Sequence, residues 1–405
     1  MATTVVSGSL KPGSLNSKQF KQAVDSKLHR LWPDGKRLAT FLNQLPEEKV
    51  YQEQYYWYEI DNRTGESDTL GAEASASDDS LTVTTGGYYK PGDCLVIWAE
   101  GSNTTEYLRV NGTVSGTTVP VQRAYAGSAS IHASGATVLN IGPAFEDGSS
   151  MADRGYSKEE EIYNNIEFPR LAFSVTRWTQ QQQMLTGQSL TNLRESKLIE
   201  WWRQLEMKFI LQARSRKTVN GNLLQTSGGL DQNISTNVVV MGTTTGWTGN
   251  TTMTETEWEA FLEISMYYGG EKGRKMLIAS PFFISVVNRF PSSKLQTAAG
   301  GSKYGFKLDM VTTPHGELDI MPHKLLNHYG ATNRYDILGS YAYIIDPGNI
   351  KKVTFAEGGG FHHDRFDAKT LQGVHETREE YWTDIGWKIM LEKTHSKLTS
   401  VTAAA

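Results

Sequence analysis

Hydrophobic positions recur at helical spacing in one long segment of the chain. In NLRESKLIEWWRQLEMKFILQARSR, residues 192–216, the apolar positions are Leu198, Trp201, Trp202, Leu205, Phe209 and Ile210. Repetition every three or four residues is typical of a helix with one face on a hydrophobic core. Asn192 and Glu195 also fit a capping box at its start. We therefore predict a helix over about residues 190–216, which would be about 35 Å long.

An aromatic segment over residues 50–62, VYQEQYYWYEIDN, shows a different pattern. Successive side chains of a strand point to opposite faces, so its odd-numbered aromatic residues share one face and Tyr56, Tyr58 and Ile60 the other. A strand that is apolar on both faces is either central in a sheet or packed against a neighbouring chain. Residues 156–178 regain strand character, and we predict that they return alongside 50–62 as one long hairpin.

Residues 67–148, between these two segments, are rich in Gly, Ser, Thr, Ala and Val. Short strand-like runs such as SLTVTTGG, CLVIWAE and EYLRVNGTVSG are separated by turn residues. Short strands at this spacing are typical of a small β-barrel or β-sandwich. We predict that one of these is inserted in the hairpin.

Helix and strand patterns alternate after the long helix. TETEWEAFLEISMYYGG predicts a helix with Thr254 and Glu257 as a capping box, and SPFFISVVNRF predicts one with Ser280 as N-cap before Pro281. RKMLIAS, between them, has the pattern of a buried strand. TREEYWTDIGWKIMLEKTH, residues 377–395, alternates like one long strand. The predicted fold class is α+β.

The first 50 residues have a polar composition, with a possible short helix in SKQFKQAVDSKLHRLW before Pro33. Such a segment cannot bury a core of its own. We interpret it as an arm that becomes ordered only against something else.

Composition excludes several protein classes. The 405-residue chain has a net charge of −4 and 21% charged residues, typical of a soluble globular protein made inside a cell. It lacks the basic excess that is usual in specific nucleic-acid binders. Cys94 is the only cysteine, which excludes an intrachain disulfide and a cysteine-rich zinc site. The sequence contains neither a signal-peptide pattern nor an apolar run long enough for a membrane span.

The stretch GGGFHHDRFD is the strongest candidate for chemistry. Its histidines and charged residues are His362, His363, Asp364, Arg365 and Asp367. Neighbours in an extended chain point apart, so at most one of the two histidines could share an ion with Asp364 or with the nearby His375. A zinc site needs three or four converging ligands. We interpret the stretch as a polar surface or interface loop rather than as a metal site.

Other candidates have ordinary structural interpretations. The carboxylates at 159–161 fit a solvated charge run, Trp201 and Trp202 fit core packing rather than a stacking platform, and Cys94 fits a small core residue rather than a nucleophile. The sequence has no P-loop, G-x-G-x-x-G, H-E-x-x-H, G-x-S-x-G or EF-hand pattern. We predict no catalytic, cofactor-binding or metal residues, no cofactor and no enzymatic activity.

The order of the elements resembles the major capsid proteins of tailed bacteriophages, whose fold is shared with the herpesvirus capsid floor. Four stretches carry the resemblance: YYWYEIDN with the β insertion after it, NLRESKLIEWWRQLEMKFILQARSR followed by GGLDQNI, EWEAFLEISMYYGGEKGRKMLIASPFFISVVNRF, and SYAYIIDPGNIKKVTF leading into REEYWTDIGWKIMLEKTHSKLTSV. They span nearly the whole chain. The chain looks closest to the subgroup with a β domain inserted in the extended loop.

The resemblance implies a domain layout. The parts are an N-terminal arm (1–49), an extended-loop hairpin (50–66 and 149–178), an inserted β domain (67–148), a peripheral domain with a spine helix at about 190–216 (179–251 and 361–405) and an axial domain (252–360).

The resemblance also implies a function. The chain would be a structural major capsid protein of the virion, assembled in the host cytoplasm. It would form hexamers and pentamers, through its arm, extended loop and axial domain, in an icosahedral shell around double-stranded DNA. Its near-neutral charge suits packaging, because strong attraction to DNA would impede it. Further partners would be scaffolding, portal and decoration proteins and, non-specifically, DNA, but no membrane.

Two properties of some family members are not expected here. We can assign no lysine–asparagine pair for covalent cross-linking. Only about 50 residues precede the hairpin, which leaves little room for a cleaved scaffolding segment.

Two other functions stay open at this point. A carbohydrate-binding or adhesin-type protein could use the aromatic residues of the β insertion, which are Tyr88, Tyr89, Trp98, Tyr107 and Tyr125. A hydrolase or metalloenzyme could use His362, His363 and His375. Histidines at a subunit boundary could also make assembly sensitive to pH.

Overall fold

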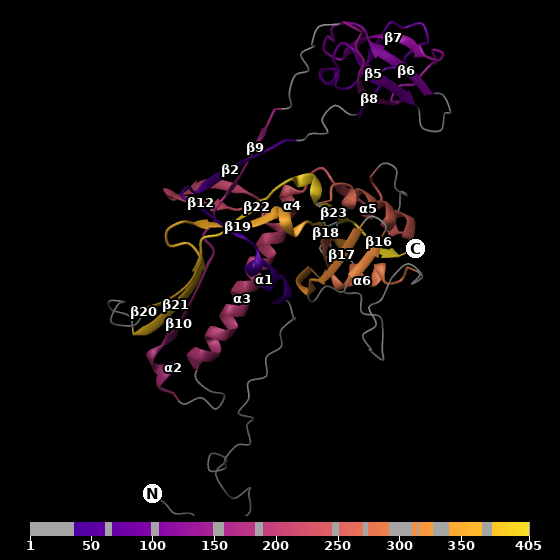
Figure 1. The fold of residues 1–405 in the computed structure, drawn as a ribbon. Helices are drawn as coiled ribbons and strands as arrows, with labels where there is room; N and C mark the ends of the chain where they lie inside the picture. The colour runs from indigo at the N-terminus through magenta and orange to yellow at the C-terminus, as the bar shows by residue number, and fades with distance from the viewer. Residues whose placement is uncertain are drawn as a thin grey trace, which may run out of the picture. The chain divides into compact units, whose positions relative to one another are not determined.

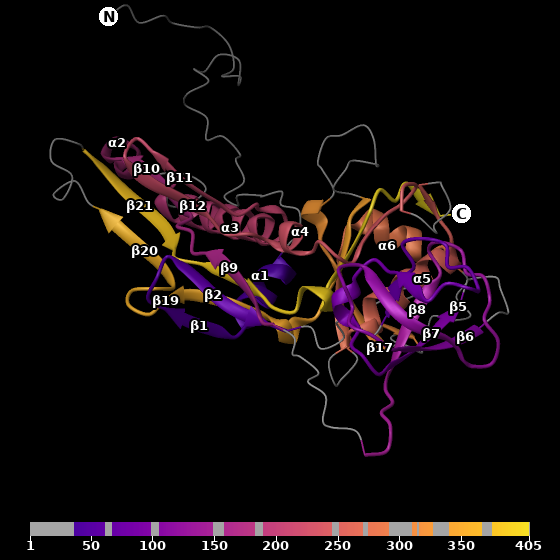
Figure 2. The same cartoon turned by 90° about the horizontal axis from the view of Figure 1, so that it is seen from above.

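The structure is a computed structural model, drawn from two directions in Figures 1 and 2. It describes residues 36–60, 67–98, 105–148, 158–182, 189–244, 251–269, 274–290, 310–313, 316–326, 340–366 and 375–404. Most of the predicted arm, with its short helix, lies outside these residues. The chain divides into two compact units, Trp57–Ile162 and the remainder, and each is described by itself. Among the helices described, none is both long and apolar enough to cross a membrane.

The longest element is helix α3, Ser189–Leu211 (Figure 1). It confirms the predicted long helix but ends five residues early. The chain returns against its last turn, where the amide of Gly229 donates to Gln212 O at 2.7 Å. A Cβ atom on Gly229 would lie 2.5 Å from Phe209 O, so only glycine fits this approach. The predicted capping box is wrong, because Asn192 lies inside the helix.

Two three-stranded sheets accompany α3. The first has the strand order β10 (Arg170–Thr176), β21 (Glu376–Thr383), β20 (Phe361–Phe366). The second has the strand order β1 (Glu47–Val50), β19 (Ile350–Phe355), β22 (Gly386–Ile389). The predicted continuous terminal strand is therefore wrong: β21 and β22 belong to different sheets. Between them, Ile385 forms an isolated bridge with Glu167, which redirects the chain.

The helices and one large cluster of apolar side chains hold these sheets together. The remaining elements here are α1 (Lys36–Gln44), α2 (Arg177–Gln181), α4 (Leu230–Asn233) and the hairpin of β11 (Ser215–Val219) and β12 (Asn222–Thr226). Leu38 and Leu42 of α1 are buried in the same cluster as Trp201, Phe209 and Trp387. The end of the predicted arm is thus ordered against the chain's own core.

A second core lies around a six-stranded sheet with two helices. The strands are, in order, β13 (Val238–Val240), β23 (Ser396–Thr399), β18 (Ala342–Ile345), β15 (Arg274–Ala279), β17 (Gly316–Pro322) and β16 (Met310–Thr313), and nearby lie α5 (Glu255–Tyr267), α6 (Pro281–Val287) and the pair β14 (Thr252–Met253) and β24 (Ala403–Ala404). Short 3-10 helices lie at η5 (Lys324–Leu326), η7 (Pro347–Asn349) and η8 (Glu392–Thr394). The capping box of Thr254 and Glu257 is confirmed, as is Ser280 as N-cap before Pro281.

The Trp57–Ile162 unit contains a small closed barrel. Its strands are, in order, β3 (Ser67–Thr69), β8 (Thr137–Pro143), β5 (Asp93–Trp98), β6 (Thr105–Val110), β7 (Thr118–Ala126) and β4 (Ser80–Thr82), with η3 (Gly86–Tyr88) after β4. A bridge between Leu70 and Val83 joins the first strand to the last and closes the sheet. The interior is apolar and includes Leu95, Ile97 and Leu108. Closure removes the exposed edges that an open sheet would have.

Candidate functional site

Strands β2 (Gln54–Glu59) and β9 (Glu160–Asn165) form a two-stranded ribbon. Tyr58 donates to the Glu161 carboxylate at 2.9 Å, and the rings of Tyr56 and Tyr163 lie 5.8 Å apart. Residue numbers rise on one strand as they fall on the other, so the strands are antiparallel. The predicted return of the chain is confirmed for β9, whereas β10 pairs with β21 instead.

The two faces of β2 differ in exposure. Tyr55 and Trp57 are 6% and 7% exposed, whereas Tyr56 and Tyr58 are 47% and 63% exposed. A ribbon of two strands cannot bury both of its faces alone. Of the two environments predicted for this strand, a central place in a larger sheet is not found, because β2 pairs only with β9 within the described residues.

The root of the ribbon is tied down by Asn164, whose side chain is buried. Its amide donates to Gly228 O at 3.0 Å and to Trp387 O at 2.7 Å, and its Oδ1 accepts from the Gly228 amide at 2.8 Å. The next residue, Asn165, donates to the carbonyls of Ser215 and Thr226. Two adjacent asparagines thus join the ribbon to three other segments of the chain.

Glu167 continues this anchor beside the end of α3. Lys208 donates to its Oε1 at 3.1 Å, and the amide of Ser227 donates to its Oε2 at 3.3 Å. Burial raises the pKa of Glu167 in spite of the lysine. The group is a buried structural carboxylate that joins the segment after β9 to the end of α3.

Within the stretch GGGFHHDRFD, Phe361–Phe366 form strand β20 rather than the predicted loop, and Asp367 lies outside the described residues. Its register on β21 pairs His362 with Trp382 and His363 with Tyr381. Because β20 is extended, the two histidines point to opposite faces of the sheet, as predicted. His375 lies at the other end of β21, where its carbonyl accepts from the Arg177 amide at 3.0 Å.

On the inner face, the buried Glu379 collects three basic side chains. Arg194 of α3 donates two hydrogen bonds to its carboxylate, His363 Nε2 lies at 3.1 Å and Arg365 Nε at 3.9 Å. Burial alone would raise the pKa of Glu379, but the hydrogen bonds from Arg194 and His363 hold it below its usual value. This cluster joins β20 and β21 to α3.

On the outer face, His362 stacks on Trp382 with the ring centroids 4.0 Å apart, and Phe168 lies 5.4 Å from the same indole. Trp382 Nε1 donates to Asp364 at 2.6 Å. The histidines therefore have aromatic and carboxylate partners in two separate environments. Among the described residues, no group of three or more His, Cys, Asp or Glu could hold a metal ion.

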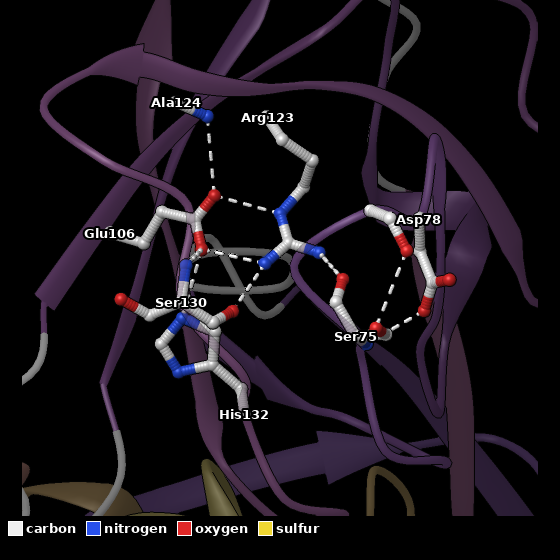
Figure 3. A network of polar contacts seen from close by, with 8 residues as sticks. Ser75, Asp78, Glu106, Arg123, Ala124, Ser130 and His132 are labelled. Atoms are coloured by element: carbon white, nitrogen blue, oxygen red, sulfur yellow. Dashed lines mark hydrogen bonds and ion pairs between the residues drawn. The ribbon is translucent and has the colours of Figure 1, made fainter.

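The barrel contains a buried polar network that sequence analysis missed (Figure 3). Arg123 donates two hydrogen bonds of 2.7 Å to Glu106, and His132 Nε2 lies 3.1 Å from the same carboxylate. The amides of Ala124 and Ser130 also donate to it. Burial opposes ionisation of Glu106, but hydrogen bonds from Arg123 and the two amides outweigh it and lower its pKa to about 2. The network ties the β7–β8 connection to β6.

A second group missed by sequence analysis is Lys275 of β15, which is 1% exposed. Its ammonium donates to the carbonyls of Ser265 and Tyr268, at the end of α5, and to Thr394 O of η8. Burial lowers the pKa of Lys275 to about 8. A single lysine inside an apolar run gave no sequence signal for this role, because its partners are main-chain atoms.

The structure also tests the remaining candidates. Trp201 is buried and packs edge-on against Trp202, which confirms core packing. The carboxylates at 159–161 are exposed, as predicted. Cys94 was predicted in the core, but it alternates with Leu95 and lies half-buried on the outer side of the barrel.

Tyr89 and Tyr88 do not form an aromatic surface on the barrel: Tyr89 is 1% exposed and Tyr88 packs against the barrel core. The aromatic surface that a carbohydrate-binding function would need is thereby reduced. Of the five aromatic residues predicted for it, three are well exposed: Trp98, Tyr107 and Tyr125.

Comparison with known proteins gives one extensive family match. Residues 15–402 match the family described as SU10 major capsid protein. No curated protein matches the chain.

Several solved structures are distantly similar to the chain. An encapsulin complex (holo-SrpI) from Synechococcus elongatus PCC 7942 shares 8% identity at a TM-score of 0.46 over 98% of both chains. The capsid of a native GTA particle shares 10% sequence identity at a TM-score of 0.46. The match covers 96% of this chain and 97% of the GTA chain. A structure from Mycobacterium phage Ogopogo shares 10% sequence identity with the chain at a TM-score of 0.47. The match covers 97% of this chain and 99% of the phage chain.

The family match covers the arm's end, both cores, the ribbon and the barrel, and so nearly every element described above. Its members are structural proteins of the virion and not enzymes, which agrees with the structural roles of Glu379 and Glu106. The chain therefore belongs to the SU10 family of phage major capsid proteins, which form the icosahedral capsid of the virion.

Proposed function

We propose that the chain assembles into hexamers and pentamers of a shell around double-stranded DNA, and that the β2–β9 ribbon is the extended loop that reaches a neighbouring subunit. The barrel would then be a β domain inserted in that loop. The proposed parts are the arm (1–49), extended loop (50–66 and 149–178), inserted domain (67–148), peripheral domain (179–251 and 361–405) and axial domain (252–360).

One observation carries this proposal: the ribbon is anchored at its root and unsatisfied along one face. Asn164 and Glu167 hold its root through hydrogen bonds of buried side chains. Tyr56 and Tyr58 stay about half exposed or more. Exposed aromatic side chains on a rigid support are typical of interface anchors.

The test replaces Tyr58 with serine. We expect Tyr58→Ser to fold, because the side chain is 63% exposed, but to lower shell yield at least about tenfold. Electron microscopy would count shells, and circular dichroism would check the fold. Tyr58→Phe is the matched control: it keeps the ring and loses only the bond to Glu161, so it should assemble. Normal shells from Tyr58→Ser would contradict the proposed docking of the ribbon.

The arm and the further partners are separate proposals. We propose that the arm contributes to subunit contacts, so deletion of residues 1–35 should reduce assembly while α1 keeps its place on the core. Scaffolding, portal and decoration proteins and packaged DNA are proposed as partners. The near-neutral chain supports weak, non-specific DNA contact.

A further inference from the structure

Helix α5 has an apolar stripe on its exposed side. Its buried side packs in the second core through Trp258, Phe261, Leu262 and Met266. On the opposite side, Ala260, Ile264 and Tyr267 follow each other at helical spacing. Ile264 and Tyr267 are 37% and 59% exposed. A stripe at this spacing is the surface on which a second amphipathic helix can pack.

The same side of α5 is acidic. Residues 255–267 contain four glutamates and no basic residue. Glu257 belongs to the capping box, whereas Glu259 and Glu263 are exposed. They are four residues apart, one position before Ala260 and Ile264, so they lie along one edge of the apolar stripe. A partner for this side of α5 must therefore combine an apolar stripe with basic side chains beside it.

The N-terminal arm contains a segment of this kind, SKQFKQAVDSKLHRLW, residues 17–32. The segment lies outside the described residues, and its pattern comes from the sequence alone. It has four basic side chains and one acidic side chain. Its apolar positions at helical spacing are Phe20, Val24, Leu28 and Leu31. Both the charge and the spacing of this segment complement the exposed side of α5.

The arm that reaches α5 must come from a second copy of the chain. Ile278 of β15 packs in the core with α1, whereas its neighbours Leu277 and Ala279 pack in the core with α5. Helices α1 and α5 therefore lie on opposite faces of the six-stranded sheet. The arm segment ends four residues before Lys36, where α1 begins, and four residues span at most about 14 Å. Because a helix alone is about 10 Å across, this link is too short to pass around the sheet to the outer side of α5.

We propose that residues 17–32 of one subunit dock as a helix on the exposed side of α5 of a second copy. The inference rests on the proposed shell assembly and identifies the surface that the arm contacts there. The apolar side chains of the arm pack along Ala260, Ile264 and Tyr267, and its basic side chains lie beside Glu259 and Glu263. Docking orders a segment that cannot bury a core of its own.

Two chains with one cysteine each test this docking, both in a Cys94→Ser background that removes the native cysteine. One chain carries Val24→Cys in the arm, and the other carries Ile264→Cys on α5. The two chains would be assembled together, treated with a short bismaleimide and separated on a denaturing gel, with electron microscopy of the same sample. We expect a dimer band that contains both variants by mass spectrometry, whereas shells of either chain alone should give none.

Two further variants test the choice of partner. Leu224→Cys in place of Val24→Cys places the thiol on the β11–β12 hairpin, a basic element with exposed aliphatic side chains, and should give no dimer. Adding Glu259→Lys and Glu263→Lys to the α5 chain should lower cross-linking at least about fivefold, as expected for the loss of one exposed ion pair of about 1 kcal/mol. Adding Lys21→Glu and Arg30→Glu to the arm chain should then restore it.

The outcomes separate this docking from the proposed function. Intact shells without the mixed dimer would overturn the inference and leave the proposed function standing. So would a dimer of equal yield with Leu224→Cys, or a cross-link within one chain when Val24→Cys and Ile264→Cys are combined. Absence of shells from the Cys94→Ser chain would count against the proposed assembly itself.

Discussion

The barrel and the β2–β9 ribbon differ in how they pair their strand edges and bury their apolar side chains. The barrel closes its sheet through the Leu70–Val83 bridge and buries its own apolar core. The ribbon has two strands, one open aromatic face and an anchor made by buried polar side chains at its root. A closed sheet can stand alone, whereas a ribbon needs a partner surface. In the proposed function, the open element is the one that contacts a neighbouring subunit.

The strongest way to break this comparison is to open the barrel from inside. Arg123→Met leaves the buried Glu106 carboxylate without its guanidinium. An uncompensated buried charge typically costs about 3–5 kcal/mol. We expect a large loss of barrel stability, measured by calorimetric unfolding of the full chain. Arg109→Met is the matched control, because its partner Glu146 is exposed and the pair should contribute under about 1 kcal/mol.

Acid should weaken the barrel through the same group. The pKa of Glu106 is lowered to about 2 in the folded chain, against an ordinary value of 4.5. Its contribution, about 3 kcal/mol, is therefore fully present above pH 4.5 and is lost as the pH falls toward 2. Calorimetry of the wild type from pH 7 to pH 2 would show this. A barrel transition that weakens mainly between pH 7 and 5 would contradict it.

The ribbon should fail at its root rather than along its strands. Asn164→Ala removes the hydrogen bonds to Gly228 and Trp387 and leaves buried main-chain groups unpaired, at a cost of about 2 kcal/mol. Hydrogen exchange of the Gly228 amide should rise. Gln54→Ala removes the partly buried hydrogen bond from Gln54 to Asn165 and should lower the free energy of unfolding by less. Equal effects would mean that the anchor is not localised at Asn164.

The smallest effect is expected at the stretch that looked most like chemistry. His362→Gln removes one ring from an open face where His362 stacks on Trp382, and stacking of this kind contributes about 0.5–1.5 kcal/mol. Unfolding by denaturant should show a loss of about 1 kcal/mol or less. His363→Gln, which loses the contact with buried Glu379, should cost more. The reverse order would show that the inner cluster contributes little.

Elements with strong local signals were predictable, and their ends and partners were less so. The capping box of Thr254 with Glu257 follows from two residues three apart, and the structure contains it. The similar pair Asn192 and Glu195 failed, because α3 starts earlier at Ser189. Helix α3 ends where Gly229, from a later segment, contacts its last turn, and no local sequence pattern predicts that contact.

The histidine stretch shows the same limit. Alternation in an extended chain correctly separated His362 from His363. It did not show that the stretch is a strand, because its pairing partner, β21, begins ten residues after β20 ends. Nor did it show that His363 and Arg365 meet the buried Glu379 of β21 together with Arg194 of α3, because both of these partners lie outside the stretch.

The sequence by itself determined the order of elements, the long helix, the β-rich region between the two ribbon strands, the lack of catalytic motifs and the resemblance to capsid proteins. These depend on local spacing and composition, which a single chain displays directly. The tertiary structure decided that one face of β2 stays open, that Cys94 points outward and that Glu106 and Lys275 are buried with partners. Those outcomes depend on which distant segments pack together, because burial and hydrogen bonding are properties of the folded surroundings and not of the residue type.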